Sequence, residues 1–148
     1  MFVEAINPGQ DDIIIEPSAG TGSFSDQLKE IFPNTFAYDL HPEKSYILQQ
    51  DYLNYPVPDV EDKTHVIGNP PFGRQSSLVR KFVKKSAEFA DTISFILPKS
   101  FKKRSLMQVF PPHYHLKQQY ELPKNSFTIE GKPHNVPCIF QIWELRDE

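Results

Sequence analysis

The stretch Ile13–Phe24, with the sequence IIIEPSAGTGSF, gives the strongest indication of the fold. Its three consecutive β-branched residues are typical of a strand that is buried on both faces, as in a parallel sheet. A Gly-x-Gly turn follows, and then an amphipathic stretch in which Phe24, Leu28 and Ile31 recur at helical spacing. Strand, glycine-rich turn and helix in this order form the first unit of a Rossmann-like nucleotide site, which predicts an α/β fold.

The turn at Gly20 and Gly22 departs from the usual dinucleotide-binding pattern in two ways. Ser25 stands where a third glycine is expected, and Glu16 directly precedes the turn. An acid at this place repels a pyrophosphate, but it suits a cationic ligand such as the sulfonium of S-adenosylmethionine. A lone Gly-x-Gly after a strand is more often an ordinary turn, so the ligand-site interpretation depends on the motifs that follow.

A second motif, Asn69-Pro70-Pro71-Phe72, follows the apolar run 65–68, which we interpret as another buried strand. Neither proline can donate a hydrogen bond to a neighbouring strand, so the strand ends there. The turn places an amide side chain, backbone carbonyls and an aromatic ring at the carboxyl end of the strand. Such a site can accept hydrogen bonds from an exocyclic amino group and stack on the ring that carries it.

The rest of the chain alternates between strand and helix patterns, and its last two strands have no helix between them. This order predicts a mostly parallel sheet that ends in an antiparallel β-hairpin. The expected strands are 12–17, 35–39, 46–50, 64–68, 92–97, 115–122 and 136–145, and the expected helices are 24–32, 75–89 and 100–110.

Length and composition are those of a single domain without a membrane span. The chain has 148 residues, 39% of them hydrophobic, and no apolar run approaches the roughly 20 residues of a membrane helix. The single cysteine, Cys138, excludes an internal disulfide and a cysteine-based zinc site, and we expect no metal. No signal peptide is evident at the N-terminus. We expect one catalytic domain over 1–148 in an intracellular, cytoplasmic protein.

Charge is divided unevenly along the sequence. Residues 1–62 contain two cationic side chains against twelve acids, whereas residues 74–132 contain twelve cations against four acids. An acidic half that holds a cationic cofactor and a basic half that meets a polyanion would suit an enzyme acting on nucleic acid. Solvated helix faces are the alternative for any single lysine. The candidate phosphate contacts are Arg74, Arg80, Lys84, Lys102 and Lys103.

Together, the motifs resemble the amino-group class of S-adenosylmethionine-dependent methyltransferases, specifically the N6-adenine type with an Asn-Pro-Pro-Phe motif. The resemblance covers about residues 12–145, and the segment Asn135–Glu144 is similar to small members from phages and large viruses. It implies catalytic roles for Asn69, Pro70, Pro71 and Phe72. The implied cofactor contacts are Glu16, Pro17, Ser18, Ala19, Gly20, Gly22, Phe24, Asp39, Leu40, Asp51, Tyr52 and Asn69.

Three of these positions have specific implied roles. Asp39, about 20 residues beyond the glycine-rich turn, would hold the ribose hydroxyls of the cofactor. Asp51 would accept its adenine amino group, and Tyr52 would pack on its adenine ring. The acceptor implied is adenine N6 in nucleic acid, with DNA favoured over RNA.

Two departures from the family keep other interpretations open. We expect the helix that family members carry before the first strand to be truncated to residues 1–10, and we expect no separate target-recognition domain. A partner protein subunit could supply recognition. The alternatives are methylation of a glutamine amide or of the guanine amino group, or a non-catalytic module that binds nucleic acid.

Overall fold

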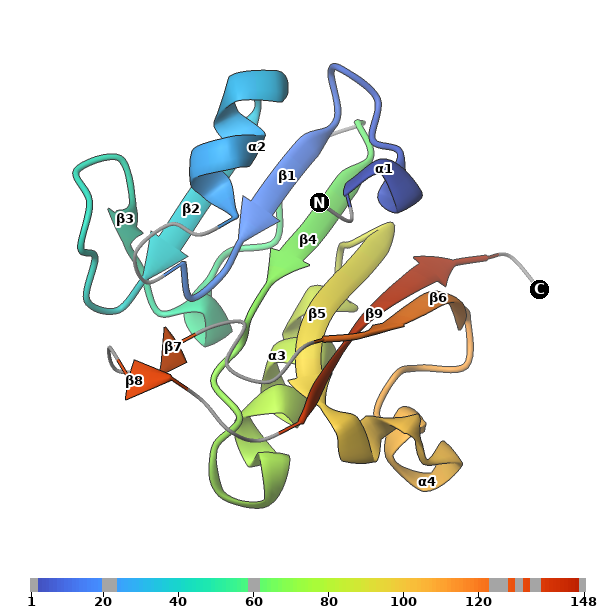
Figure 1. The fold of residues 1–148 in the computed structure, drawn as a ribbon. Helices are drawn as coiled ribbons and strands as arrows, with labels where there is room; N and C mark the ends of the chain where they lie inside the picture. The colour runs from blue at the N-terminus through green and yellow to red at the C-terminus, as the bar shows by residue number, and fades with distance from the viewer. Residues whose placement is uncertain are drawn as a thin grey trace.

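A computed structural model of the chain describes residues 3–19, 24–58, 62–122, 128–129, 132–133 and 137–146. Its main sheet consists of seven strands (Figure 1). None of the helices in these ranges is long and apolar enough to cross a membrane. The strands are β1 Ile13–Glu16, β2 Thr35–Asp39, β3 Leu48–Gln49, β4 Thr64–Gly68, β5 Thr92–Pro98, β6 Tyr114–Glu121 and β9 Cys138–Leu145, with a separate small pair, β7 Thr128–Ile129 and β8 Lys132–Pro133. The helices are α1 Val3–Ile6, α2 Ser25–Ile31, α3 Ser77–Ser86 and α4 Arg104–Met107, with 3-10 turns η1 Tyr52–Asn54, η2 Arg74–Ser76 and η3 Lys99–Lys102.

The strand order is β3-β2-β1-β4-β5-β9-β6. Strands β1 to β5 are parallel, whereas β9 runs antiparallel to both β5 and β6. The chain moves outward from β1 through β2 to β3 and then returns to the other side of β1 with β4. The point where the order reverses is where open α/β sheets bind ligands, outside the carboxyl ends of the strands. The predicted mostly parallel sheet with an antiparallel closing hairpin is confirmed.

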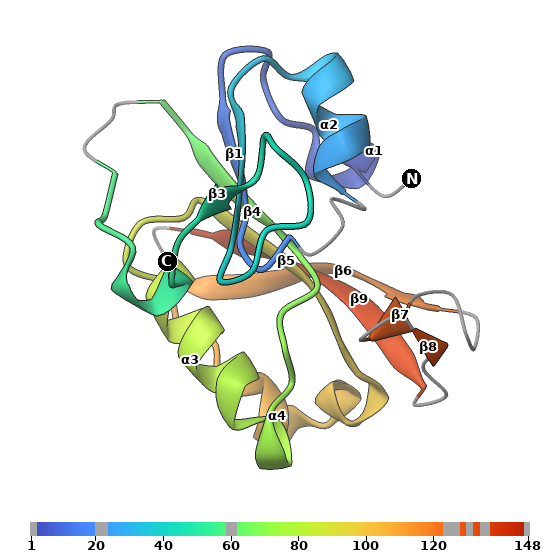
Figure 2. The same cartoon turned by 90° about the vertical axis from the view of Figure 1, so that its left-hand side faces the viewer.

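Both faces of the sheet are covered, which explains the uninterrupted apolar strands. Ile15 and Val66 belong to a core that α3 covers with Val79 and other residues, whereas Ile14 belongs to a core on the opposite face. Figure 2 shows α1 and α2 on that second face and α3 on the first. A strand between two helical layers has no solvent face, so its side chains are apolar on both sides.

The helices differ from the sequence prediction at three places. In α2, Ile31 is 50% exposed and Phe32 is buried instead, so the predicted apolar face is wrong at that residue. The helix expected at 75–89 begins at Ser77, because Gln75 and Ser76 adopt positive φ angles. The helix expected at 100–110 is two short pieces, since Lys103 between them has extended dihedral angles.

A buried polar cluster joins the amino ends of three strands. The His65 ring lies between Asp12, at 2.7 Å from Nε2 to Oδ2, and Thr92, at 2.8 Å from Nδ1 to Oγ1. Gly9 also donates its N–H to Asp12 at 2.8 Å. Burial acts to raise the pKa of Asp12, but the hydrogen bonds from His65 and Gly9 outweigh it and lower that pKa below 3.8. The cluster therefore stabilises the folded state while Asp12 is ionised.

Replacing Asp12 with alanine should lower the free energy of unfolding by about 1–3 kcal/mol, because it leaves a buried imidazole nitrogen without its partner. The contribution should be present above pH 3.8 and lost as the pH falls below it, since the folded state favours ionised Asp12. Urea denaturation at several pH values measures both effects. Asp11→Ala, at an exposed neighbouring position, is the matched control. Equal stability of the two variants would contradict this role for Asp12.

Candidate active site

The two principal motifs lie side by side at the carboxyl edge of the sheet. Strand β1 ends at Glu16 and the adjacent strand β4 ends at Gly68, with Ile15 paired to Val66. A β-carbon placed on Gly68 would lie 3.4 Å from the Pro17 carbonyl oxygen, so the two strand ends are in contact. The predicted cofactor segment and the predicted catalytic segment therefore leave the sheet next to each other.

Glu16 is a buried acid at the centre of this edge. Its side chain is 2% exposed, and its Oε1 accepts a hydrogen bond from the Ser25 backbone N–H at 2.8 Å. Burial raises the pKa of Glu16 to about 7, although the hydrogen bonds from Ser25 act in the opposite direction. A carboxyl group with such a raised pKa is partly protonated at neutral pH, and a nearby cation would favour its ionised form.

Ser25 begins a chain of contacts that joins α2 to the loop after β2. Its hydroxyl lies 2.9 Å from the Tyr46 hydroxyl, and Tyr46 in turn donates to Asp26. Lys44 forms an ion pair with the same Asp26 carboxylate. The sequence analysis considered Ser25 only as the position of a missing glycine, and it did not predict a role for Tyr46. The signal that could have indicated this contact is a serine at the start of a helix, with a tyrosine and a lysine in the following loop.

The end of β2 brings a second acid to the edge. Asp39 is partly buried, and its Oδ1 accepts the His41 backbone N–H at 2.9 Å. The neighbouring Leu40 is 53% exposed. The Ala19 N–H donates to the Tyr38 carbonyl at 2.7 Å, which holds the segment after β1 against the end of β2.

The predicted cofactor segment is partly buried. Pro17 and Ala19 are buried, whereas Ser18 is half-buried with a positive φ of 58°. Pro17 and Ala19 can therefore contact a ligand through their backbone groups, but they expose little side-chain surface to it. Gly20 and Gly22, which the sequence places in the turn, lie outside the described residues.

Asp51 and Tyr52 serve the local structure more than the sequence predicts. The Asp51 carboxylate accepts the Leu53 N–H at 3.0 Å and the Asn54 side-chain amide at 3.1 Å, and so caps η1. Tyr52 is 2% exposed, and its hydroxyl lies 2.6 Å from the Ser86 hydroxyl. Its ring packs against three other rings under α3. Core residues already cover most of this ring, and the predicted packing of Tyr52 on a cofactor ring stays a prediction.

Phe24 also contributes to packing. Its ring stacks on Phe140 of β9, with ring centres 6.1 Å apart, and it packs against the core on the α2 face. Phe24 is only partly buried, so part of its surface faces outward beside Ser25. The predicted contact with a cofactor stays a prediction at this position.

The Asn-Pro-Pro-Phe turn carries an amide side chain without a hydrogen-bond partner among the described residues. Asn69 is half-buried, and within the described part of the chain its side chain makes no hydrogen bond. Pro70 is buried and Pro71 is exposed. Phe72 is partly buried against both cores, and its carbonyl accepts N–H groups from the first turn of α3 at 3.2 and 3.5 Å. The turn is therefore fixed at both ends while the Asn69 amide remains available to a ligand.

The turn is followed by a strained segment. Gly73, Gln75 and Ser76 have positive φ angles of 70°, 54° and 61°. A β-carbon on Gly73 would lie 2.8 Å from the Leu78 Cγ, closer than packed atoms tolerate. Backbone strain of this kind is concentrated at functional sites, where the surrounding structure holds it in place.

Gly73→Ala should destabilise the protein by about 1–3 kcal/mol, because alanine meets both an unfavourable φ and a clash with Leu78. It should also displace Phe72, with little effect on the predicted cofactor segment at the β1 end. Thermal unfolding measures the loss of stability, and the aromatic circular dichroism signal reports the displacement of Phe72. Wild-type stability would show that the Gly73 conformation is unimportant.

The predicted phosphate-contact residues are not equivalent. Lys102 forms an ion pair with Glu121 at 3.0 Å, and Lys99 shares the same carboxylate at 3.1 Å. Arg74, Arg80, Lys84 and Lys103 are exposed and form no ion pair with any described residue. Lys102 is thus partly neutralised, whereas the other four cations have no acidic partner within the part of the chain that the structure describes.

No protein-family model and no curated protein matches this chain, but solved structures match its fold. The 23S rRNA methyltransferase ErmE superimposes with a TM-score of 0.69 at 15% identity, covering 99% of this chain and 66% of that one. TrmN from Thermus thermophilus gives 0.67 at 16% identity, covering 98% of this chain and 47% of that one. A dimethyladenosine transferase from Plasmodium falciparum gives 0.68 at 13% identity, covering 99% and 59%.

At such low identities the similarity shows the fold alone. The chain has the Rossmann-like methyltransferase fold, and it spans 66%, 47% and 59% of the lengths of these three proteins. A shared fold does not determine a reaction, so activity has to be argued from the site.

Proposed function

We propose that the chain is an S-adenosylmethionine-dependent methyltransferase whose acceptor is an exocyclic amino nitrogen, adenine N6 in nucleic acid. The observation that carries this proposal is the Asn69 amide, unengaged among the described residues and fixed at the end of β4 beside Glu16 at the end of β1. An acceptor held by Asn69 would face a cofactor held at the neighbouring strand end.

The residues of the β1 and β2 ends suit a cationic cofactor. Glu16 supplies buried negative charge, and Asp39 lies where an acid meets ribose hydroxyls in related folds. Asp51 keeps acceptor capacity beyond its two hydrogen bonds, because each carboxylate oxygen has two lone pairs. When bound, the cofactor would supply an electrophilic methyl group on its sulfonium.

The chemistry follows from the weakness of the acceptor. The lone pair of an adenine amino nitrogen is delocalised into the ring, which makes that nitrogen a poor nucleophile. If the Asn69 side-chain oxygen and the Pro70 carbonyl accept its two N–H bonds, the nitrogen becomes pyramidal and its lone pair localises. That nitrogen would bond to the methyl carbon as the bond from this carbon to sulfur breaks, and it would afterwards release one proton to solvent. Because these hydrogen bonds strengthen as positive charge develops, they stabilise the transition state.

Phe72 and the unpaired cations would hold the rest of the acceptor. Stacking of a base on an aromatic side chain such as Phe72 contributes about 1–3 kcal/mol. A base inside a duplex would first have to flip out of the stack. The resemblance of the motifs favours DNA as the acceptor. RNA has to be tested as well, because the similar structures include the 23S rRNA methyltransferase ErmE and a dimethyladenosine transferase.

Incubation with methyl-labelled S-adenosylmethionine and a panel of DNA, RNA and protein acceptors tests the proposal. We expect label in nucleic acid, and Asn69→Ala as the matched negative control should give none above background. Label only in protein would instead indicate a glutamine-type acceptor. Cofactor binding without transfer to any acceptor would favour a non-catalytic binding module.

A further inference from the structure

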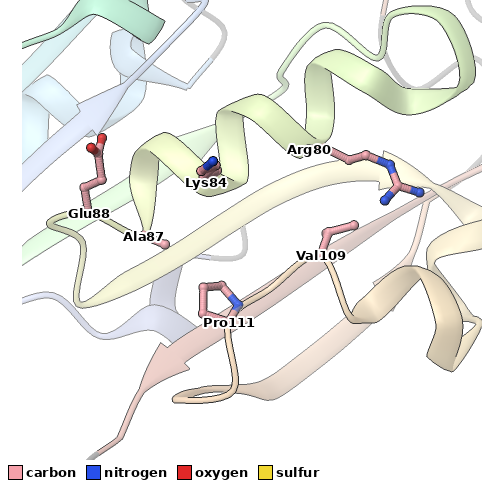
Figure 3. Close-up of a pocket in the computed structure, with 6 residues that line it drawn as sticks. All are labelled: Arg80, Lys84, Ala87, Glu88, Val109 and Pro111. Atoms are coloured by element: carbon pink, nitrogen blue, oxygen red, sulfur yellow. The ribbon is translucent and has the colours of Figure 1, made fainter.

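A cavity of about 330 Å³ lies away from the strand ends, between α3 and the segment that precedes β6 (Figure 3). Its volume is at the lower end of the range for small-molecule sites, about 300–1,000 Å³. Helix α3 connects it to the candidate active site, because the helix begins with N–H groups bonded to the Phe72 carbonyl. The lining residues are Arg80, Lys84, Ala87, Glu88, Val109 and Pro111.

The cavity has a cationic end and an apolar wall. Arg80 and Lys84 are four residues apart and therefore share one face of α3. Neither has an acidic partner among the described residues, whereas Glu88, at the other end of the cavity in Figure 3, pairs with Lys85 at 3.2 Å. Val109 and Pro111 provide apolar surface opposite the helix.

The charges are unfavourable for the isolated helix. Like charges at this spacing destabilise a helix by about 0.2–0.5 kcal/mol. The helix dipole favours cations in the last turn and so accounts for Lys84, but Arg80, the fourth residue of α3, gains nothing from it. An external anion bound between the two side chains would offset the repulsion between them.

We propose that this cavity binds a nucleotide of the substrate strand next to the target, with a phosphate between Arg80 and Lys84 and its base against Val109 and Pro111. The inference rests on the proposed function and extends it to the path of the substrate. Arg80 and Lys84 are about 6 Å apart along the helix axis, at 1.5 Å per residue. The substrate strand would then run from Phe72 along the outer face of α3.

The charge reversal Arg80→Glu/Lys84→Glu tests the proposal, with Lys63→Glu/Lys81→Glu as the matched control. The control makes the same change in net charge at exposed positions that do not line the cavity. Affinity is measured for random-sequence single-stranded DNA and RNA over a range of salt concentrations. Methyl transfer to the same pools and to free adenosine is measured in parallel.

We expect the cavity variant to flatten the slope of log affinity against log salt by about 0.7, the change for one phosphate contact on a single strand. Transfer to free adenosine, where detectable, should match that of wild type. If cavity and control variants bind equally well while the wild type methylates nucleic acid, the cavity is not part of the substrate path, although the proposed function stands. If a polyglutamate peptide displaces the nucleic acid from wild type but not from the cavity variant, the site is one for acidic protein. If the wild type neither binds nor methylates nucleic acid, both proposals fail.

Discussion

Replacing Asn69 with alanine should reduce methyl transfer by about 10²–10³-fold, the usual effect of removing one preorganised hydrogen-bonding group from a transition state. The dissociation constant for S-adenosylmethionine should change by no more than a few-fold. The reason is geometric: Asn69 follows the end of β4 and is proposed to bind the acceptor, whereas the predicted cofactor segment leaves the sheet from β1. Single-turnover kinetics and calorimetry measure the two quantities separately.

Asn34→Ala is the matched control, since it removes the same amide from a half-buried position just before β2, at the opposite edge of the sheet. Its turnover should stay far closer to wild type than that of the Asn69 variant. If Asn69→Ala retains most of its turnover, the amino-group mechanism is wrong. If it loses turnover and cofactor affinity together, Asn69 is a cofactor residue instead.

The second large effect is expected at Glu16. Its pKa is raised from 4.5 to about 7, which corresponds to about 3 kcal/mol at 1.36 kcal/mol per pKa unit. The folded state thus binds this proton more tightly than the unfolded state, and stability should fall as the pH rises from 4.5 through 7. Glu16→Gln should remove this fall and stabilise the protein by up to about 3 kcal/mol above pH 7. Below pH 4.5 the two proteins should be equally stable.

The same variant should bind S-adenosylmethionine more weakly, because a neutral amide does not attract a sulfonium. The affinity of wild type should fall as the pH drops below 7, whereas the uncharged product S-adenosylhomocysteine should show little of this dependence. Glu30→Gln, an exposed acid on α2, is the control and should alter neither property. A Glu16 variant that loses stability above pH 7 and keeps full cofactor affinity would contradict the proposed role.

The positions of the strands could be predicted because the sheet is buried on both faces. In β2 and β4 the predicted bounds match the structure, since each strand is set off by a proline or a polar turn. The predicted strand bounds also indicated that Glu16, Asp39 and Asn69 lie at the carboxyl ends of strands. In a parallel sheet these ends meet at one edge.

Side-chain roles were predicted less well, because burial depends on partners far away in the sequence. Tyr52 follows a strand-end acid like a ligand-binding aromatic, yet it packs under Phe82, thirty residues further along the chain. Phe32, not Ile31, faces the core in α2. The hydroxyl contact between Ser25 and Tyr46 depends on the loop between β2 and β3, whose path no periodic pattern describes.

In the basic half of the chain, the positions of the charges could also be predicted from the sequence, but their ion-pair partners could not. Clustering of lysines and arginines was visible in the sequence, but the pairing of Lys102 with Glu121 requires β6 to return beside η3. Arg80 and Lys84 become distinct only when the cations that pair with an acid in the described ranges are set aside.

The position of the transferred methyl group tests the central claim most directly. After reaction with labelled cofactor, the nucleic acid is digested to nucleosides and these are resolved by liquid chromatography and mass spectrometry. The account predicts label in N6-methyladenine nucleosides, at a level that Asn69→Ala abolishes. Label on a ring nitrogen, a carbon or a sugar hydroxyl, or transfer that survives in the Asn69 variant, would contradict it.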